Sequence, residues 1–324
     1  MTIRMRTALA GLAALALTAA SPAGLTQAST VGRHGGPGTG TTKVLTLDPS
    51  TPGDNPEGVA WDPRSETFFV GTVASGAIYR ATLRDRTLRP FITPDPADPA
   101  DSAIGMKVSG GRLFVAGGPT GSIYVYGIRS GALLARFETG PGGFLNDLVV
   151  TGAGDVYVTD SFRPTLWHLS PAMVRTGTGA PEAISVAPEI AYTAGQFNLN
   201  GIVDRRGGRE LIVVSTISGS LFRIGLDAKN PGARTITRID APALAGDGLL
   251  IDRGRLLVVT GNPAQVTFLK LSERDTRARV DRVLTDPTLR GPSTIARADN
   301  RYLVVNADFT GNAQPYTVSS IDRR

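Results

Sequence analysis

Four polar pairs along the chain combine carboxylate and amide side chains. They are Glu57-Gly58, Asn146-Asp147, Asn200-Gly201 and Asp247-Gly248. Carboxylate and amide oxygens are the ligands that calcium, magnesium and manganese take in proteins. Two carboxylates brought to one point would repel each other unless a cation lay between them. These residue types therefore predict an oxygen-ligated divalent metal site. The alternative is that the Asn-Gly and Asp-Gly dipeptides simply form turns.

Other kinds of chemistry find little support in the composition. The chain has no cysteine, so it has no thiolate ligand, disulfide or cysteine nucleophile. Its two histidines, His34 and His168, are not accompanied by a Gly-x-Ser-x-Gly motif, which leaves a serine-hydrolase triad without support. The net charge of +6 comes from arginines scattered among acids. Without a basic cluster, nucleic-acid binding is not expected.

The elements that must position the polar pairs recur six times along the chain. Each unit holds a short apolar run, a Gly/Asp turn, a β-branched run, a second turn and a third run. The units begin at Glu57, Gly105, Asn146, Asn200, Asp247 and Ser293. Their separation of roughly 40–50 residues is the size of one propeller blade.

A fourth, outer strand can be placed in most units. It fits Leu88–Thr93, Leu133–Glu138, Arg234–Ile239 and Val280–Leu284. Since no stretch shows sustained helical periodicity, the pattern predicts an all-β, six-bladed β-propeller. A β-sandwich or solenoid is the alternative, but sandwich strands do not repeat as near-identical triplets. In a propeller the first strand of each blade lines the axis, so we expect the residues before those strands to meet at one mouth.

The two ends of the repeat array complement each other. The sixth unit has only three strands, whereas Lys43–Leu47 is a strand pattern with no unit of its own. We expect this segment to supply the outer strand of the last blade and to close the ring. The propeller domain is therefore predicted to span residues 43–324.

The N-terminal segment reads as an export signal. Arg4 and Arg6 precede an apolar run that is too short to span a bilayer, which predicts a signal peptide over residues 1–28. Residues 29–42 are rich in glycine, threonine and serine and are expected to form a flexible leader. The sequence thus predicts a secreted, extracellular protein without a membrane span.

At the polar pairs the sequence resembles the senescence-marker-protein (regucalcin)/gluconolactonase/LRE-like family of six-bladed β-propellers, as a secreted bacterial member. The shared features are Glu57-Gly58 followed by Trp61, Asn146-Asp147 followed by Tyr157-Val-Thr-Asp160-Ser161, Asn200-Gly201, and Asp247-Gly-Leu-Leu-Ile-Asp252. The resemblance implies one divalent metal ion held by Glu57, Asn200 and Asp247. Calcium is favoured, with magnesium, manganese or zinc as alternatives. The resemblance also implies that Asn146 holds substrate or water and that Asp247 is the catalytic general base for hydrolysis of a lactone or related ester.

Two positions depart from the family pattern. Phe144 stands where sugar-lactone members carry an arginine, and Val59 replaces a common proline. We therefore expect Phe144 to contact the substrate, and we expect this small molecule to be a more apolar lactone or ester. The protein is also expected to be a monomer. Two alternatives stay open. One is a non-catalytic extracellular ligand-binding propeller, and the other is an enzyme of another class, such as a strictosidine-synthase-like condensing enzyme.

Overall fold

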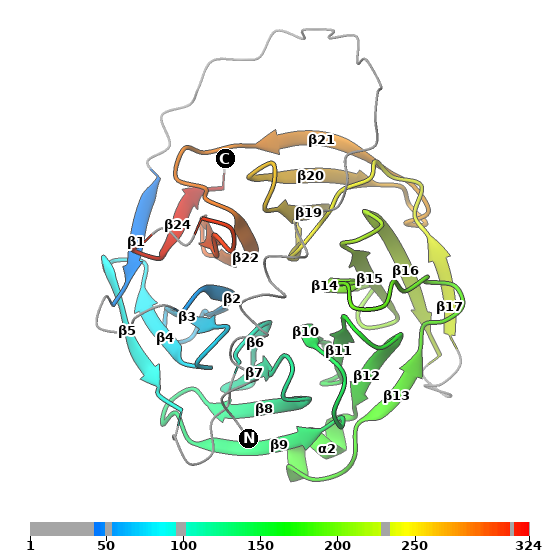
Figure 1. Ribbon diagram of the computed structural model, residues 1–324, viewed down its shortest axis with the longest axis horizontal. Coiled ribbons are helices and arrows are strands. Elements are labelled where there is room, and N and C mark those ends of the chain that lie inside the picture. Colours follow the sequence, from blue (N-terminus) through cyan, green and yellow to red (C-terminus); the bar gives the residue numbers. More distant parts are fainter. Residues whose placement is uncertain (1–41, 49–53, 95–101, 228–233, 312–313, 324) are drawn as a thin grey trace, which may run out of the picture.

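The chain folds into antiparallel sheets that follow one another around a central axis, as in a β-propeller (Figure 1). The structure, a computed structural model, describes residues 42–48, 54–94, 102–227, 234–311 and 314–323. The predicted signal peptide, and all of the predicted leader except Thr42, lie outside these residues. The all-β class predicted from the sequence is confirmed.

The strands form four four-stranded sheets and one eight-stranded sheet. From the axis outward, the four-stranded sheets are β6 (Met106–Ser109), β7 (Arg112–Ala116), β8 (Ser122–Gly127) and β9 (Leu133–Glu138); β10 (Leu145–Val150), β11 (Val156–Asp160), β12 (Thr165–Leu169) and β13 (Glu182–Ser185); β14 (Leu199–Arg205), β15 (Glu210–Ser215), β16 (Ser220–Leu226) and β17 (Arg234–Arg238); and β18 (Leu249–Asp252), β19 (Arg255–Thr260), β20 (Gln265–Leu271) and β21 (Ala278–Leu284). The eight-stranded sheet has the order β2 (Pro56–Asp62), β3 (Thr67–Thr72), β4 (Ile78–Thr82), β5 (Thr87–Ile92), β1 (Lys43–Leu47), β24 (Thr317–Asp322), β23 (Arg301–Asn306) and β22 (Pro292–Ala298).

Burial changes from the axis to the rim of each sheet. Second strands such as β7 and β19 are buried at every position except the first, because both faces of the sheet pack against neighbouring sheets. Outer strands such as β9 and β21 are largely exposed. This is why the second strands read as continuous apolar runs.

Two elements were not predicted. They are β13 and a short helix, α2 (Pro171–Thr176), which begins after the N-cap Ser170 and ends at Gly177 in a left-handed conformation. Both lie between the Asn146 and Asn200 units, and they account for the long separation of those two units.

The eight-stranded sheet contains the predicted ring closure. β1 pairs antiparallel with β24, with Lys43 opposite Ser320 and Thr46 opposite Thr317. It also pairs in parallel with β5 on its other side, through Thr46 and Leu47. Leu45 and Leu47 are buried in the core beneath. The predicted pairing of residues 43–47 with the outermost strand of the last unit is confirmed.

Five apolar cores among the described residues lie between two consecutive sheets, and a sixth lies between the two halves of the eight-stranded sheet. For example, Phe114 and Val125 of one sheet pack against Leu148 and Val158 of the next. The sheets are therefore held together around the ring mainly by burial of apolar side chains. Among the described residues, no helix combines the length and apolar character needed to cross a bilayer.

Candidate functional site

The innermost strands carry β-bulges where they begin. The pairing register shifts between Pro56 and Val59 in β2, and it shifts in the same way at the start of three other innermost strands, β10, β14 and β22. A bulge removes residues from the ladder and re-aims their side chains. The bulged pairs include Glu57-Gly58, Asn146-Asp147 and Asn200-Gly201. The predicted polar pairs thus lie where the strands leave regular pairing.

We call six residue pairs at the starts of these strands the axial openings. They are Glu57-Gly58, Ile104-Gly105, Asn146-Asp147, Asn200-Gly201, Asp247-Gly248 and Ser293-Thr294.

The opening of the second unit is Ile104, and the prediction of Gly105 was wrong by one residue. Ile104 N–H donates to Ala116 O at 2.9 Å, and the Ala116 N–H donates back to Gly105 O at 2.9 Å. Asp247 and Gly248 make the same two bonds with Val259, at 2.8 and 3.0 Å. An apolar side chain therefore occupies one position of the ring.

Backbone hydrogen bonds connect successive openings. Gly105 N–H donates to Asn146 O at 2.8 Å, Gly201 N–H to Asp247 O at 3.0 Å, and Gly248 N–H to Ser293 O at 2.8 Å. The Ser293 hydroxyl donates to Glu57 O at 2.9 Å. The openings are thus linked from one sheet to the next.

Close approach of the sheets explains the glycines of the openings. A Cβ on Gly201 would lie 2.4 Å from Asp247 O, and a Cβ on Gly248 would lie 2.7 Å from Thr294 Cα. Neither glycine has the left-handed backbone that a tight turn would need. The turn explanation of these dipeptides is therefore wrong: the glycines let two backbones meet.

Glu57 is the most unusual side chain at the axis. Its residue is only 8% exposed, and its carboxylate accepts no hydrogen bond from any residue that the structure describes. Burial raises the pKa of Glu57 well above its usual range, and the charges of Asp247 and Asp147 raise it further. The charges of Asp147 in β10 and of Asp247, which precedes β18, therefore reach Glu57 in β2. Figure 1 shows β2 and β10 beside the axis.

Asp247 is the second carboxylate of this group and keeps part of its surface exposed. Burial of its carboxylate raises the pKa of Asp247 to about 7; a hydrogen bond from the Asn200 amide opposes the shift, and the charge of Asp147 adds to it. The structure thus brings together Glu57, Asn200 and Asp247, the three residues predicted to bind metal.

Asn146 lies on the neighbouring strand with its amide fixed. Its Nδ2 donates to Ser161 Oγ at 3.0 Å, and Ser161 Oγ donates to Leu199 O at 2.6 Å. The amide oxygen is therefore the part of Asn146 left for substrate or water.

Asp147 has partners that the sequence did not reveal. Its Oδ1 accepts from Lys107 Nζ at 3.1 Å and from Leu148 N–H at 2.8 Å, and its Oδ2 accepts from Ile202 N–H at 3.3 Å. These contacts tie three sheets together at the axis. Asp147 is thus a structural carboxylate, and Lys107 supplies a positive charge beside the site.

The donor set at the axis fits a hard cation. No group of three histidine, cysteine, aspartate or glutamate side chains in the described part of the chain is arranged to hold a metal ion. The axial set instead consists of Glu57, Asp247 and the amide of Asn200, which offers oxygens only. A buried carboxylate without a hydrogen-bond donor, next to a second carboxylate, is the environment that a calcium, magnesium or manganese ion would stabilise. Zinc, which prefers nitrogen and sulfur ligands, fits this set less well.

Phe144 belongs to an aromatic cluster at the same end of the sheets. Its ring centroid lies 5.5 Å from that of Phe162 and 5.0 Å from that of Phe197, and the last two are 5.2 Å apart. We call these three residues the aromatic cluster. Phe162 and Phe197 were not predicted as site residues, although Phe162 directly follows Ser161 and Phe197 lies three residues before Asn200.

A buried carboxylate organises the loops that carry the cluster. Asp160 Oδ1 accepts from the N–H groups of Phe144 at 2.9 Å, Phe162 at 3.1 Å and Arg163 at 3.0 Å. Its Oδ2 accepts from Arg163 Nε at 2.6 Å and Trp167 Nε1 at 3.2 Å. Asp160 therefore has a structural role.

His168 is also explained by structural contacts. It is buried in β12, its ring nitrogens lie 2.8 Å from Asp155 Oδ1 and 3.2 Å from Glu182 Oε2, and it stacks on Tyr157. These contacts give His168 a structural role.

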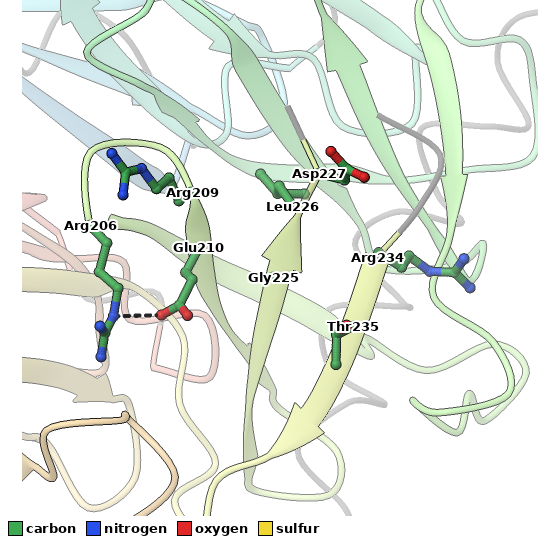
Figure 2. Close-up of a pocket in the computed structure, with 8 residues that line it drawn as sticks. All are labelled: Arg206, Arg209, Glu210, Gly225, Leu226, Asp227, Arg234 and Thr235. Carbon is green, nitrogen blue, oxygen red and sulfur yellow. Dashed lines mark ion pairs between the residues drawn. The ribbon is translucent and has the colours of Figure 1, made fainter. Parts of the chain in front are cut away.

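A surface pocket lies away from the axis. It has a volume of about 640 Å³ and lies beside β15, β16 and β17, with Arg206, Arg209 and Glu210 among its lining residues (Figure 2). Arg206 Nε is 2.8 Å from Glu210 Oε2. No residue of the axial openings lines this pocket, so its chemistry is separate from theirs.

No family model and no curated protein sequence matches the chain. Solved structures share its fold. A calcium-binding regucalcin from Agrobacterium tumefaciens is 18% identical, with a TM-score of 0.61 over 86% of this chain and 94% of that one. A gluconolactonase from Xanthomonas campestris is 17% identical, with a TM-score of 0.58 over 83% of this chain and 86% of that one.

A third similar structure carries a different name. Virginiamycin B lyase from Staphylococcus aureus is 10% identical, with a TM-score of 0.52 over 87% of this chain and 99% of that one. Because all these identities are low, the similarity establishes the fold and does not select an activity. The predicted resemblance to regucalcin and gluconolactonase is thus confirmed for the fold: this chain is a β-propeller similar to both.

Proposed function

We propose that the protein is an exported, metal-dependent hydrolase of a lactone or related ester that acts at the axial openings. The observation that carries the proposal is the Glu57 carboxylate, which belongs to a buried residue, accepts no hydrogen bond from the described residues and lies within reach of the charges of Asp247 and Asp147. Burial and these charges disfavour its ionised form, which a bound cation would stabilise. The regucalcin and gluconolactonase structures with this fold support the choice of chemistry.

Charge balance supports a divalent ion. Glu57, Asp147 and Asp247 are three acidic groups when ionised, and Lys107, which pairs with Asp147, is one basic group. The remaining two negative charges match one calcium, magnesium or manganese ion. Glu57, Asn200 and Asp247 would hold this ion, which would polarise the substrate carbonyl and lower the pKa of bound water.

The chain's own residues would then share the remaining work. Asp247 would accept the proton of the attacking water as general base. Asn146, held by Ser161, would orient the substrate through its amide oxygen. Phe144 would contact the substrate beside Asn146.

The finer architecture belongs to the same proposal. We count the eight-stranded sheet as two four-stranded blades joined by the β1–β5 pair, which gives a six-bladed propeller over residues 43–324. Residues 1–28 would be a signal peptide and 29–42 a leader, so that the mature protein would act outside the cell as a monomer.

The test is a metal analysis combined with a substrate screen. Purified mature protein should contain one divalent ion per chain and hydrolyse members of a lactone and ester panel, and a chelator should abolish the activity until metal is restored. Glu57→Ala should lose both metal and activity. Glu189→Ala, which removes an exposed carboxylate far from the axis, is the control and should keep both.

The second candidate is a non-catalytic, extracellular ligand-binding propeller. The aromatic cluster favours it, since aromatic side chains can hold an apolar ligand without any reaction. A wild-type protein that binds metal but hydrolyses nothing in the panel would replace the hydrolase proposal with this one.

A further inference from the structure

We infer that the aromatic cluster of Phe144, Phe162 and Phe197 is a subsite for an apolar, ring-sized substituent of the substrate. The inference rests on the proposed function, because the substituent belongs to the molecule whose carbonyl would bind at the axial openings. It names the substrate class as lactones or esters that carry such a group next to the reacting ring.

The geometry of the cluster leaves aromatic surface for a ligand. The three centroids are 5.0–5.5 Å apart, with Phe144 and Phe197 edge to face at 88°. Phe144 is buried at 6% exposure, whereas Phe162 and Phe197 are only half-buried. The outer two rings therefore offer open surface above a fully packed one.

The cluster is not part of the apolar cores between the sheets. The cores on either side of the β10–β13 sheet contain residues such as Leu148 and Leu166 but none of the three phenylalanines. Core packing alone therefore does not account for three aromatic rings gathered on loops. Phe162 lies in the turn between β11 and β12, while Phe144 and Phe197 precede β10 and β14, all at the end where the innermost strands begin.

The same backbone segments position the cluster and the polar site. Ser161, which receives the Asn146 amide, directly precedes Phe162. Asn198, directly after Phe197, donates through Nδ2 to Ser161 O at 3.0 Å. The segments that hold the Asn146 amide therefore also carry two of the three aromatic rings.

The loops beneath the cluster are fixed before any ligand arrives. Arg163 donates to Asp160 at 2.6 Å, to Thr139 O at 2.9 Å and to Thr139 Oγ1 at 2.8 Å. Binding then requires little further ordering of the protein. The same contacts occupy the guanidinium, so Arg163 is not available to bind the hydroxyl groups of a sugar lactone.

The experiment compares two lactones that differ by one group. For wild-type protein we expect kcat/KM for phenyl-substituted δ-valerolactone to exceed that for unsubstituted δ-valerolactone by about tenfold or more. Phe162→Ala and Phe197→Ala should reduce this ratio to about threefold or less while changing the rate on the unsubstituted lactone little. Both residues are half-buried, so both variants should fold.

Phe91→Ala is the matched control. Phe91 is also half-buried and also pairs with another phenylalanine, Phe69, at 5.0 Å, but it lies on the outer strand β5. This variant should keep the wild-type ratio. A ratio near one in the wild type, or an equal loss in Phe91→Ala, would overturn the subsite while leaving the hydrolase proposal intact.

A binding measurement separates this inference from the proposed function. Calorimetry with the phenyl-substituted δ-valerolactam, which resists hydrolysis, should show binding to wild type and at least about tenfold weaker binding to Phe197→Ala. If wild type hydrolyses no lactone but shows this difference, the subsite stands and the hydrolase proposal fails. If the phenyl group improves neither binding nor hydrolysis, the subsite is wrong.

Discussion

Two buried carboxylates, Glu57 at the axis and Asp252 at the end of β18, have opposite surroundings. Asp252 accepts from Tyr302 Oη and from Arg323 Nη2, each at 2.6 Å. Burial acts to raise its pKa, but the hydrogen bonds from Tyr302 and Arg323 outweigh burial, and the pKa of Asp252 is lowered. Glu57 is buried without donors, and its pKa is raised.

The difference separates a structural carboxylate from the carboxylate that we propose binds metal. Asp252 joins β18 to β23 and to the segment after β24, so its charge stabilises the fold. Glu57 contributes no such contact, and its charged form opposes folding unless a ligand compensates for it. We therefore expect substitution of Glu57 to reduce activity without reducing stability, and substitution of Asp252 to reduce stability without reducing activity.

The largest effect is expected for Glu57→Gln, which removes the charge and keeps the shape. Lactone hydrolysis should fall to the background rate and metal content should fall with it, because an amide is a weaker ligand than a carboxylate. The melting temperature of the metal-free protein should not decrease, since a buried unpaired charge has been removed. A clear loss of stability in the metal-free variant would show that Glu57 is structural as well.

Removing the ring-closing strand should have the next largest effect. A protein beginning after Leu47 should lose at least about 4 kcal/mol of unfolding free energy, because Leu45 and Leu47 are buried and β24 loses its ladder partner. A protein beginning after Gly40 should match the full mature chain. Equal urea midpoints for the two truncations would contradict the closure role of β1.

Asp247→Asn separates the two roles proposed for Asp247, metal ligand and general base. The variant keeps an oxygen ligand but loses the proton acceptor, so we expect it to retain measurable metal and to hydrolyse lactones about 100-fold more slowly. Metal analysis and kcat on the best substrate of the panel provide the measurement. Unchanged kcat would remove Asp247 as general base and leave it as a ligand only.

Asp252→Asn is the counterpart of Glu57→Gln. It should lower the unfolding free energy by about 2 kcal/mol, because Arg323 and Tyr302 lose a charged acceptor. Metal content and lactone hydrolysis at a temperature well below unfolding should stay at the wild-type values. A parallel loss of metal would mean that the two regions are coupled.

Lowering the pH should remove the contribution that ionised Asp252 makes to the free energy of unfolding. Because the pKa of Asp252 is lowered in the fold, its contribution is complete above the unfolded carboxyl pKa of about 3.9 and is lost as the pH falls through the lower folded value. The stability difference between wild type and Asp252→Asn should therefore be constant from pH 7 to about 5 and shrink below about 4. Urea unfolding at several pH values measures it.

The positions of most strands could be predicted from the sequence, because strand propensity and turn residues are features of short segments. The run Leu133–Glu138 has the residue types of a strand, and its predicted bounds match those of β9. Ring closure followed from counting strands: Lys43–Leu47 was the strand that the last unit lacked. Glu57, Asn200 and Asp247 could be grouped because each occupies the same position in its unit.

The rest depends on distances between sheets, which local sequence does not contain. The pairing of Lys107 with Asp147 joins two different units, and the contact of Phe162 with Phe197 joins two loops from neighbouring units. The replacement of Gly105 by Ile104 as an opening residue is visible only in the hydrogen bonds to Ala116. The role of the opening glycines likewise required the position of the next sheet.

The pairing of β1 with β24 sets the order of events during folding. Lys43 lies opposite Ser320, so β1 can pair with β24 only after almost all of the described chain has been made. Contacts between such distant parts of a chain form slowly, because a long loop must close before they are gained. Until β24 has been made, β1 and β23 lack the neighbour that covers one of their edges. The complete ring can therefore form only after β24 has been made, so this contact is among the last steps of folding.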